Sequence, residues 1–460
     1  MGRQGLRTIV VVSACVGLLS AEVSPAGPLE RPNLLVTVGE ALADHAMLWV
    51  RGDNATPVRV RYGVADHSRP MREIEIVLAP NRDNTGRVSL GPLTPGTRYA
   101  YDVSQGETRV QGTFASPPRP DADTAARLVW SGDLGGSGHC RDLEEGYAIF
   151  RAMARHRPDL FLFVGDTVYT DHRCSLGSHV PGADYVAKTL AEFHGKHRYN
   201  RADPALQEFF RSTSVFAIWD DHEVRNNFAG PTEPLMPVGL QALLDYWPIE
   251  GPAHDPRRLY RAIRWGRHLD IFVLDTRQYR SDQSETDGPA KTMLGSAQRE
   301  WLLRALAASD ATWKLVVTSV PLGQFTGGRY SDSWSNANLF GYPRATAGGY
   351  VYERDTILRF VRDRAIRNVV FVSGDVHHAE LSATSRRRAS SCTSSSRAHS
   401  RRGWGTRASS TDRSTRAPSV RSGSRRTSAR SSSTGRPCKC GSSTRRTRYA
   451  RRCGSCPTRR

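Results

Sequence analysis

The stretch Leu160-Phe161-Leu162-Phe163-Val164-Gly165-Asp166 is an apolar run that ends in glycine and a carboxylate. Short runs of this kind predict buried strands of an α/β sheet. Four further runs of the same form end at Asp133, at Asp220-Asp221, at Asp275 and at Asp375. A single Gly-Asp pair would indicate only a turn. Because ligands bind beyond the carboxyl ends of strands in such sheets, we expect all five ends to converge. Neighbouring carboxylates repel one another, so the pattern predicts a metal site.

The formal net charge of +20 on the 460-residue chain is unevenly distributed. Residues 385–460 hold 22 of the 65 lysines and arginines and one of the 45 acidic residues, which leaves 43 basic against 44 acidic residues before them. A nucleic-acid partner requires basic residues arranged on a folded surface. The nearly neutral body therefore predicts no nucleic acid as a specific partner, and the tail lacks the interleaved aromatic residues that stack on bases.

Residues 1–26 have the layout of a bacterial secretory signal peptide. Arg3 and Arg7 precede an apolar stretch from Ile9 to Leu19, and small residues follow it. The apolar stretch is too short for a transmembrane anchor. We expect export and cleavage, and hence a secreted, periplasmic or cell-surface protein. Lipidation of Cys15 is the alternative, because the residues around it resemble a lipoprotein box.

Cys140 and Cys174 are the only cysteines between the signal and the tail. Each follows a carboxylate-bearing strand end by a few residues. Because exported proteins fold in an oxidising compartment, we expect a disulfide between these two loops. Two small buried residues that never pair are the alternative.

Residues 28–117 form the first predicted domain, an all-β module. Its turn and strand from Leu93 to Tyr101 resemble those of a fibronectin type III domain, and residues 116–123, rich in Pro and Asp, form a linker. Short β-rich stretches separated by turn residues predict a sandwich of the fibronectin III or immunoglobulin type. These stretches are residues 34–38, 46–50, 58–62, 74–78, 87–90, 99–103 and 108–114.

Residues 126–384 alternate predicted strands with predicted helices, which indicates an α/β domain. Leu143, Tyr147, Phe150 and Met153 recur at helical spacing, and Pro158 ends that helix. Residues 297–307 and 355–367 read as amphipathic helices that lead into strands 313–318 and 368–373.

Residues 385–460 consist mainly of Ser, Arg and Thr without periodicity. Such a segment cannot bury enough apolar surface to offset its ordering entropy, so we expect a disordered tail. The strand 369–373 or its neighbour should then have an unpaired edge.

With suitably chosen codons, residues 392–401 read in another frame as Leu-His-Glu-Phe-Ile-Ala-Gly-Pro-Leu-Ala, an ordinary strand and turn. Our hypothesis is a frameshift near Ala383 that leaves the α/β domain incomplete; a functional basic tail is the alternative.

Several ordered motifs of the α/β domain resemble those of the PhoD-like alkaline phosphatases, within the calcineurin-like metallophosphoesterase superfamily. The resemblance covers residues 128–381, implies an αββα sandwich, and includes a fibronectin-like module in front. The motifs that carry it are Gly165-Asp166-Thr167-Val168-Tyr169, Trp219-Asp220-Asp221-His222-Glu223-Val224-Arg225-Asn226-Asn227, Asp275-Thr276-Arg277-Gln278-Tyr279-Arg280, Leu294-Gly295 with Gln298 and Trp301, and Ser373-Gly374-Asp375-Val376-His377.

The resemblance implies a binuclear or multinuclear metal centre that activates a water or hydroxide. Asp166 would bridge two metals. Tyr169 would bind iron as a phenolate, together with Asp133 and His377, as in the purple acid phosphatases; a tyrosine that only packs on the loop is the alternative. The chain lacks the cysteine that the PhoD pattern carries near Asp133, and has the purple acid phosphatase form there.

Asp221 and Asp375 replace an asparagine and a histidine of the wider superfamily. Their anionic oxygens shift the second metal site toward Ca²⁺, Mn²⁺ or Mg²⁺. The superfamily's further histidine is absent, because Ser319-Val320-Pro321 stands at that strand end. For His378, the neighbour of His377, two interpretations stay open: a surface histidine and a metal ligand.

His222 and Arg277 are the candidate catalytic residues. The resemblance places His222 between metals and substrate, where it would protonate the leaving alkoxide; a structural histidine bonded to a carboxylate such as Glu223 is the alternative. Arg277 would clamp the phosphate, since guanidinium matches phosphate oxygens with two donors, and Asp275 would orient it.

The leading hypothesis is an exported, metal-dependent phosphatase that hydrolyses small-molecule phosphate mono- or diesters. A catalytically inactive cell-surface binding protein that retains the metallophosphatase scaffold is the alternative. The sequence assigns no oligomeric state.

Overall fold

The computed structural model describes residues 33–136, 138–336, 348–384 and 392–396. The signal peptide, Cys15 and most of the tail lie outside these residues. No helix in the described ranges has the length and apolar character needed to span a bilayer.

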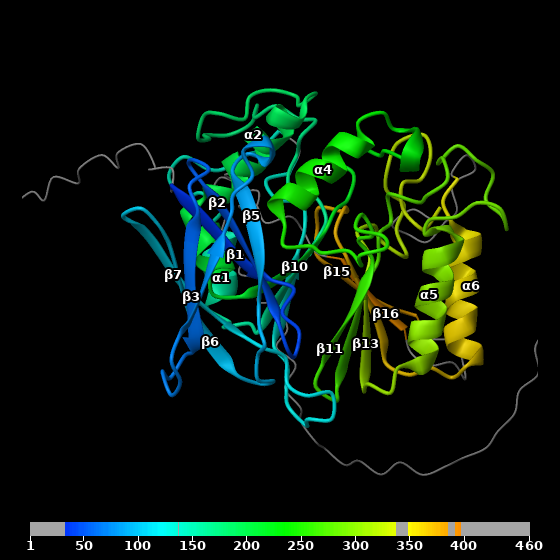
Figure 1. Cartoon of the computed structure of the whole chain (residues 1–460). Coiled ribbons are helices and arrows are strands. Elements are labelled where there is room, and N and C mark those ends of the chain that lie inside the picture. The colour runs from blue at the N-terminus through cyan, green and yellow to red at the C-terminus, as the bar shows by residue number, and fades with distance from the viewer. Residues whose placement is uncertain (1–32, 137, 337–347, 385–391, 397–460) are drawn as a thin grey trace, which may run out of the picture. The chain divides into compact units, whose positions relative to one another are not determined.

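The N-terminal part of the chain is all-β (Figure 1), and an observed strand overlaps each of the seven predicted stretches. Its core consists of alternate inward-facing residues such as Val58, Val60 and Tyr62. One sheet has the order β4-β3-β6-β7, and β5, β2 and β1 lie on the other. The strands are β1 (Leu34–Gly39), β2 (Ala46–Gly52), β3 (Val58–Val64), β4 (Arg72–Ile76), β5 (Thr85–Leu90), β6 (Arg98–Gln105) and β7 (Thr108–Ala115).

The second sandwich sheet does not end at β1, because it continues into the α/β domain. β1 pairs in parallel with β10 (Ser214–Ile218), with Gly39 opposite Val215. A side chain at residue 39 would place its Cβ 2.4 Å from the Val215 carbonyl oxygen and 2.6 Å from Pro248, so only glycine fits this junction. The six-stranded sheet therefore has the order β5-β2-β1-β10-β9-β8. Two domains expected as separate units share one sheet.

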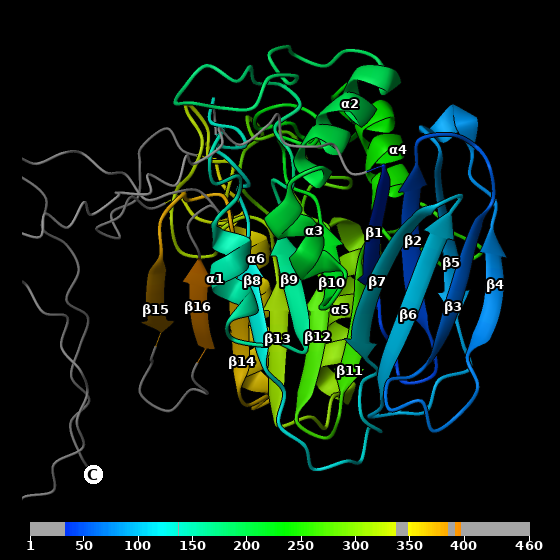
Figure 2. The same cartoon turned by 90° about the vertical axis from the view of Figure 1, so that its left-hand side faces the viewer.

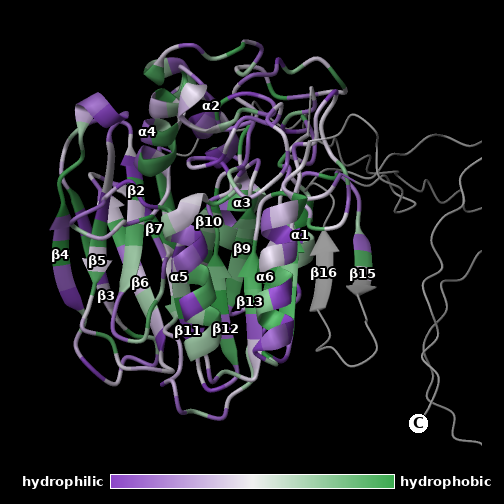
Figure 3. Cartoon of the chain, turned by 90° about the vertical axis from the view of Figure 1, so that its right-hand side faces the viewer, coloured by the Kyte–Doolittle hydropathy of each residue, from purple (hydrophilic) through white to green (hydrophobic). Residues whose placement is uncertain are grey.

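The α/β domain contains two sheets that pack face to face through apolar strands (Figure 3). The first holds β8 (Leu128–Ser131), β9 (Leu160–Val164) and β10, all parallel. The second has the order β11-β12-β13-β14-β16-β15. Its strands are β11 (Arg261–Trp265), β12 (Leu269–Val273), β13 (Trp313–Val317), β14 (Val369–Ser373), β15 (Glu380–Thr384) and β16 (Cys392–Ser396).

Helices cover the outer faces of both sheets, which gives the expected αββα layering. Helices α1 (Ile149–Ala154) and α3 (Pro204–Phe210) lie over β8, β9 and β10 (Figure 2). Helices α5 (Gly295–Ala308) and α6 (Val351–Asp363) pack on the second sheet (Figure 1). The remaining helices are α2 (Leu190–Arg201), α4 (Met236–Tyr246) and the 3₁₀ turns η1 (Pro80–Arg82) and η2 (Gly230–Thr232).

Two predicted helices have different bounds. The helix expected from Leu143 begins only at Ile149, because Gly146 has a φ of +58°, which is incompatible with a right-handed helix. The helix expected at 355–367 begins four residues earlier and ends before Ala365, whose φ is +52°.

The expectation of an unpaired edge on residues 369–373 is wrong. β14 pairs in parallel with β16, from Val369 opposite Cys392 to Ser373 opposite Ser396. β16 in turn pairs with β15, so five residues of the predicted disordered tail form a strand. Backbone hydrogen bonds between strands need no apolar side chain, and the composition of the segment therefore did not reveal the strand. The rest of residues 385–460 lies outside the described residues.

Candidate metal centre

Four of the five carboxylate-bearing strand ends meet at the carboxyl edge of the two sheets. Three groups of ligand atoms form there, each with all its atoms within 4.8 Å of one another. These groups are Asp133, Asp166 and His377; Asp166, Asp221 and His222; and Asp220, Asp221 and Asp375. Asp166 and Asp221 each belong to two groups. The three groups therefore form one continuous cluster.

Tight backbone turns after β8, β9 and β14 direct the carboxylates inward. Asp133, Asp166 and Asp375 have φ values of +57°, +48° and +71°, in the left-handed region that non-glycine residues rarely adopt. The Asp133 amide donates to the Gly165 carbonyl oxygen at 3.2 Å, and the Asp375 amide donates to the Asp133 carboxylate at 3.0 Å. The first bond joins neighbouring strand ends of one sheet, and the second joins the two sheets.

Tyr169 and His377 lie together on one side of the cluster. The Tyr169 hydroxyl and His377 Nε2 are 3.1 Å apart, and His377 Nε2 lies 3.7 Å from Asp133 Oδ1. The Tyr169 ring is buried and stacks on the His222 ring with centroids 4.2 Å apart. His378 lies outside the cluster, with Nδ1 2.8 Å from the Val376 carbonyl oxygen.

Several buried carboxylate oxygens of the cluster have no hydrogen-bond partner among the described residues. They are Asp133 Oδ2, Asp220 Oδ2, Asp221 Oδ1 and Asp375 Oδ2. Buried polar atoms are normally satisfied, and unpartnered carboxylate oxygens that face one another call for a cation. The donor set therefore fits bound metal ions.

The electrostatics of the cluster lead to the same conclusion. Burial raises the pKa values of Asp133, Asp166 and Asp375 well above their usual range, and repulsion by the neighbouring aspartates adds to the effect. Burial also raises the pKa of Asp220 to about 6, although Arg277 opposes the rise. Arg277 and His222 supply part of the positive charge that the cluster needs, and the repulsion that remains favours bound cations.

His222 is held by Asp171 and not by Glu223. Its Nδ1 lies 2.8 Å from Asp171 Oδ1, and Asp171 Oδ2 accepts the amide of Asn226 at 2.7 Å. Burial acts to lower the pKa of His222, but Asp221 and Asp171 outweigh it and raise the value to about 9. Glu223 instead accepts from the amide of Thr167 at 2.6 Å and supports the loop after β9.

Arg277 does not have the surroundings of a phosphate clamp. Its side chain is fully buried, and Nε donates to Asp220 at 2.6 Å. Nη1 and Nη2 donate to the two oxygens of Asp332 at 2.9 and 2.5 Å. These carboxylates occupy the donors that a substrate phosphate would need, so the contacts favour a structural role.

Asp275 is the strand-end carboxylate that does not join the cluster. It accepts from the Trp219 indole at 2.9 Å and from the backbone amides of Arg277 and Gln278, both at 3.0 Å. It therefore closes the loop after β12. It also orients the Arg277 backbone, and an orienting role toward Arg277 is what the sequence analysis expects of Asp275.

Sequence reasoning missed Asp171 and Asp332. Asp332 is buried and binds Arg277 and Arg280, and these arginines hold the pKa of its carboxyl well below the usual range although burial opposes them. It lies in a loop without a strand pattern, so only the polar run Ser331-Asp332-Ser333 marked it. Asp171 follows Tyr169 by two residues, so extending the Gly-Asp motif by two positions would have identified it as a candidate.

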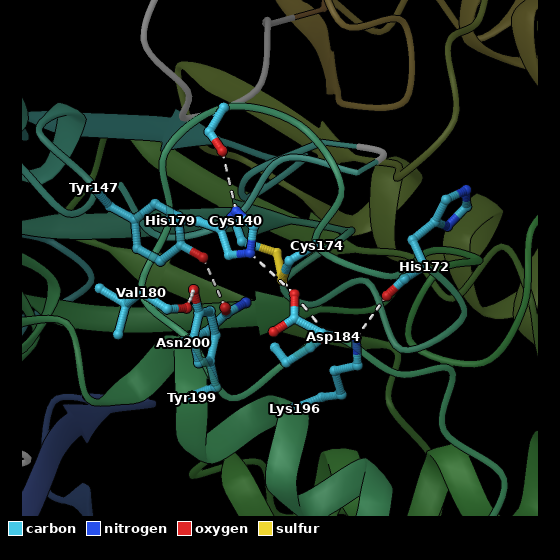
Figure 4. Close-up of a disulfide and its surroundings, with 12 residues drawn as sticks. Cys140, Tyr147, His172, Cys174, His179, Val180, Asp184, Lys196, Tyr199 and Asn200 are labelled. Atoms are coloured by element: carbon cyan, nitrogen blue, oxygen red, sulfur yellow. Dashed lines mark hydrogen bonds and ion pairs between the residues drawn. A yellow bond between two sulfur atoms is a disulfide. The ribbon is translucent and has the colours of Figure 1, made fainter. Parts of the chain in front are cut away.

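The predicted disulfide between Cys140 and Cys174 is present, with Cα atoms 5.6 Å apart (Figure 4). It joins the loop after Asp133 to the loop after Asp166. Lys196 of α2 supports the second loop by donating to the carbonyl oxygens of His172 and Ala183 at 2.6 and 2.7 Å. The two loops that carry ligands are therefore tied to each other and to α2.

A solved structure described as "Structure of PhoD" has the same fold. The TM-score is 0.66 at 24% identity, and the match covers 80% of this chain and 76% of that chain. "Alkaline phosphatase D" of Bacillus subtilis (strain 168) is 26% identical over 420 residues, which are 81% of this chain and 69% of that protein. Fold, cluster and relatives together define a hydrolase of phosphoesters.

The family follows from a further match. A family model described as "PhoD-like phosphatase" matches residues 136–431, more than half of the chain. The chain belongs to the PhoD-like phosphatase family. The family is metal-dependent, in agreement with the candidate metal-binding groups at the strand ends.

Proposed function

We propose that this protein is an exported, metal-dependent phosphatase that hydrolyses small-molecule phosphate mono- or diesters. The single observation that carries the proposal is the continuous cluster of buried aspartates with unpartnered oxygens, beside Tyr169 and His377. A scaffold retained only for binding would not need to keep these mutually repelling groups buried, because their burial destabilises the fold without a cation. The cluster therefore favours an enzyme over an inactive binding protein.

The donor set suggests which metal binds at each end of the cluster. Asp133, Asp166, Tyr169 and His377 offer carboxylate, phenolate and imidazole ligands, which suit iron. Asp221 and Asp375, with Asp220 beside them, offer only hard oxygen ligands, which suit Ca²⁺, Mn²⁺ or Mg²⁺. Asp166 belongs to two groups and is the candidate bridge between metals. When bound, the ions would polarise the phosphoryl oxygens and lower the pKa of the attacking water.

His222 would supply the proton for the leaving group. Because Nδ1 faces Asp171, Nε2 is the atom left to face the substrate. Against the effect of burial, Asp221 and Asp171 raise the pKa of the imidazole to about 9, which favours the protonated form that a general acid requires. Nε2 would donate this proton to the departing alkoxide oxygen. The stacked Tyr169 ring limits rotation of the imidazole.

The proposal is tested by comparing Asp166→Asn with the matched control Asp310→Asn. Asp310 is a surface carboxylate with a side chain 86% exposed, paired with Arg264 away from the cluster. Bound metal is measured by mass spectrometry, and turnover is measured with p-nitrophenyl phosphate and bis-p-nitrophenyl phosphate. We expect Asp166→Asn to lose metal and turnover together and Asp310→Asn to keep both. Normal turnover by Asp166→Asn would disprove the metal-centre assignment.

Export is supported by the arrangement of residues 1–26 and by the Cys140–Cys174 bridge, since disulfides persist in oxidising compartments. N-terminal sequencing of protein from a bacterial host tests it: cleavage near Ala26 supports export, and an intact Met1 in the cytoplasm contradicts it.

The seven-stranded sandwich is proposed as a fibronectin III-like module fixed to the catalytic domain through β1 and β10.

A further inference from the structure

A cavity of about 380 Å³ lies away from the metal cluster, between the sandwich strands β1 and β2, helix α2 and the loop that follows Cys174. Its lining shares no residue with the cluster. The charged and aromatic residues that line it are Arg51, Asp53, Arg141, Tyr185, Arg198 and Tyr199.

Positive charge dominates this lining, and part of it is not neutralised. Arg51 Nε and Arg198 Nη1 both bind Asp83 Oδ2, at 3.2 and 2.5 Å, so one carboxylate serves two guanidinium groups. Arg51 also lies 3.5 Å from Asp53. Arg141 has no carboxylate within 4.0 Å among the described residues. The cavity therefore carries a net positive charge.

Arg141 is the residue that indicates a ligand. It is 2% exposed, its Nη1 donates to the Tyr199 carbonyl oxygen at 3.2 Å, and its guanidinium lies 5.4 Å from the Tyr199 ring centroid. Its Nε is buried and has no hydrogen-bond partner among the described residues. Buried charges are normally paired, but the buried Asp203 acts on this guanidinium only from beyond ion-pair distance, so the group has capacity for an anion in direct contact.

Arg201, one turn from Arg198 on α2, provides an internal comparison. It too is buried without a carboxylate, but it packs on the rings of Trp49 and Trp247 at 4.6 and 4.1 Å. Its Nη1 also donates to Thr37 at 2.7 Å. Arg201 Nε, like Arg141 Nε, is buried without a hydrogen-bond partner among the described residues. The two differ in their surroundings, because aromatic rings of the core enclose the Arg201 guanidinium, whereas Arg141 meets one ring and borders a cavity.

The tyrosines indicate the rest of the ligand. The Tyr185 hydroxyl donates to the Glu192 carbonyl oxygen at 3.0 Å. The Tyr199 hydroxyl donates to the Val180 carbonyl oxygen at 2.7 Å (Figure 4). Because both hydroxyls are already used, the tyrosines contribute ring surface. Leu35 and Val180 add apolar surface to the lining.

We propose that this cavity is a second binding site for a small organic phosphate with a ring or apolar portion. Guanidinium groups match phosphate oxygens with paired donors, and several arginines suit a group that carries up to two charges. The apolar lining and the volume leave room for more than the phosphate itself. This proposal is independent of the metals that the catalytic centre binds.

The experiment is calorimetric titration of the full, metal-loaded chain with phenylphosphonate, which carries an aromatic ring and cannot be hydrolysed as an ester. We expect two sites per chain in the natural protein. Arg141→Met should weaken the second site by roughly 10-fold or more, because it removes a charged donor, and should leave turnover of p-nitrophenyl phosphate unchanged. Arg109→Met, at an arginine on the sandwich surface with a side chain 62% exposed, is the matched control and should keep both sites.

If Arg141→Met fails to fold, Arg198→Gln replaces it, since the Arg198 side chain is 39% exposed and tolerates change better. One site in the natural protein, or a second site unchanged in both variants, would overturn the proposal. Benzoate that binds the second site as tightly as phenylphosphonate would overturn the assignment to phosphate.

Discussion

Removing the Cys140–Cys174 bridge should lower the free energy of unfolding by a measurable and calculable amount. The bridge joins residues 34 apart in sequence and closes a loop that contains β9, Asp166 and Tyr169. The perturbation is the double substitution Cys140→Ser with Cys174→Ser. Cys174 is buried, but serine is smaller than cysteine and therefore introduces no clash at either position.

The magnitude follows from the length of the closed loop. In the chain-entropy treatment, a cross-link over about 35 residues removes unfolded-state entropy worth roughly 4 kcal/mol at 25 °C. Typical proteins are stable by about 5–15 kcal/mol, so this loss is a large fraction of the total. We therefore expect a lower urea midpoint without a change of fold.

Urea titration followed by tryptophan fluorescence measures the difference. The same loss should appear when the natural protein is reduced with dithiothreitol, and the double variant should not respond to the reductant. This second comparison controls for the cysteines outside the described residues. A change below about 1 kcal/mol, or a double variant as sensitive to the reductant as the natural protein, would refute the reasoning.

Four further predictions concern the centre and the C-terminal segment. His222→Asn should lower kcat by roughly 10² to 10⁴ at unchanged metal content, whereas equal loss of metal would make the residue structural. Arg277→Met should lower the free energy of unfolding by about 3–5 kcal/mol in urea titration, because it leaves buried carboxylates unpaired; a raised KM at full stability would restore the phosphate-clamp role. The folded-state pKa values of Asp133 and Asp166 are raised, so their contribution to stability is full below about pH 4 and is lost as pH rises through the raised values. Metal-free protein should therefore melt at a lower temperature at pH 8 than at pH 5, and added Ca²⁺ should reverse the loss at pH 8; equal melting temperatures without metal would contradict this. Restoring the other reading frame after Ala383 should raise soluble yield and turnover, and stop codons in that frame would exclude the idea.

The sequence identified the strand ends that build the centre because each strand is a local pattern. Apolar runs that end in aspartate need only neighbouring residues to be read, and Asp133, Asp166, Asp221 and Asp375 all reached the cluster. The seven sandwich strands were predicted for the same reason. The bridge between the two cysteines followed from their number and from the loops that hold them.

Only the tertiary structure decided which groups neutralise one another. Arg277 looked like a phosphate ligand until Asp332, 55 residues away in sequence, was found to occupy its donors. The fifth strand-end carboxylate, Asp275, left the cluster because a tryptophan indole and two amides satisfy it. The pairing of β1 with β10 likewise joins segments far apart in the chain. The local periodicity of the sequence determines where a helix or strand forms. Whether a charged side chain is neutralised, or a strand edge is paired, depends on residues far away in the sequence, and these come into contact only in the folded chain.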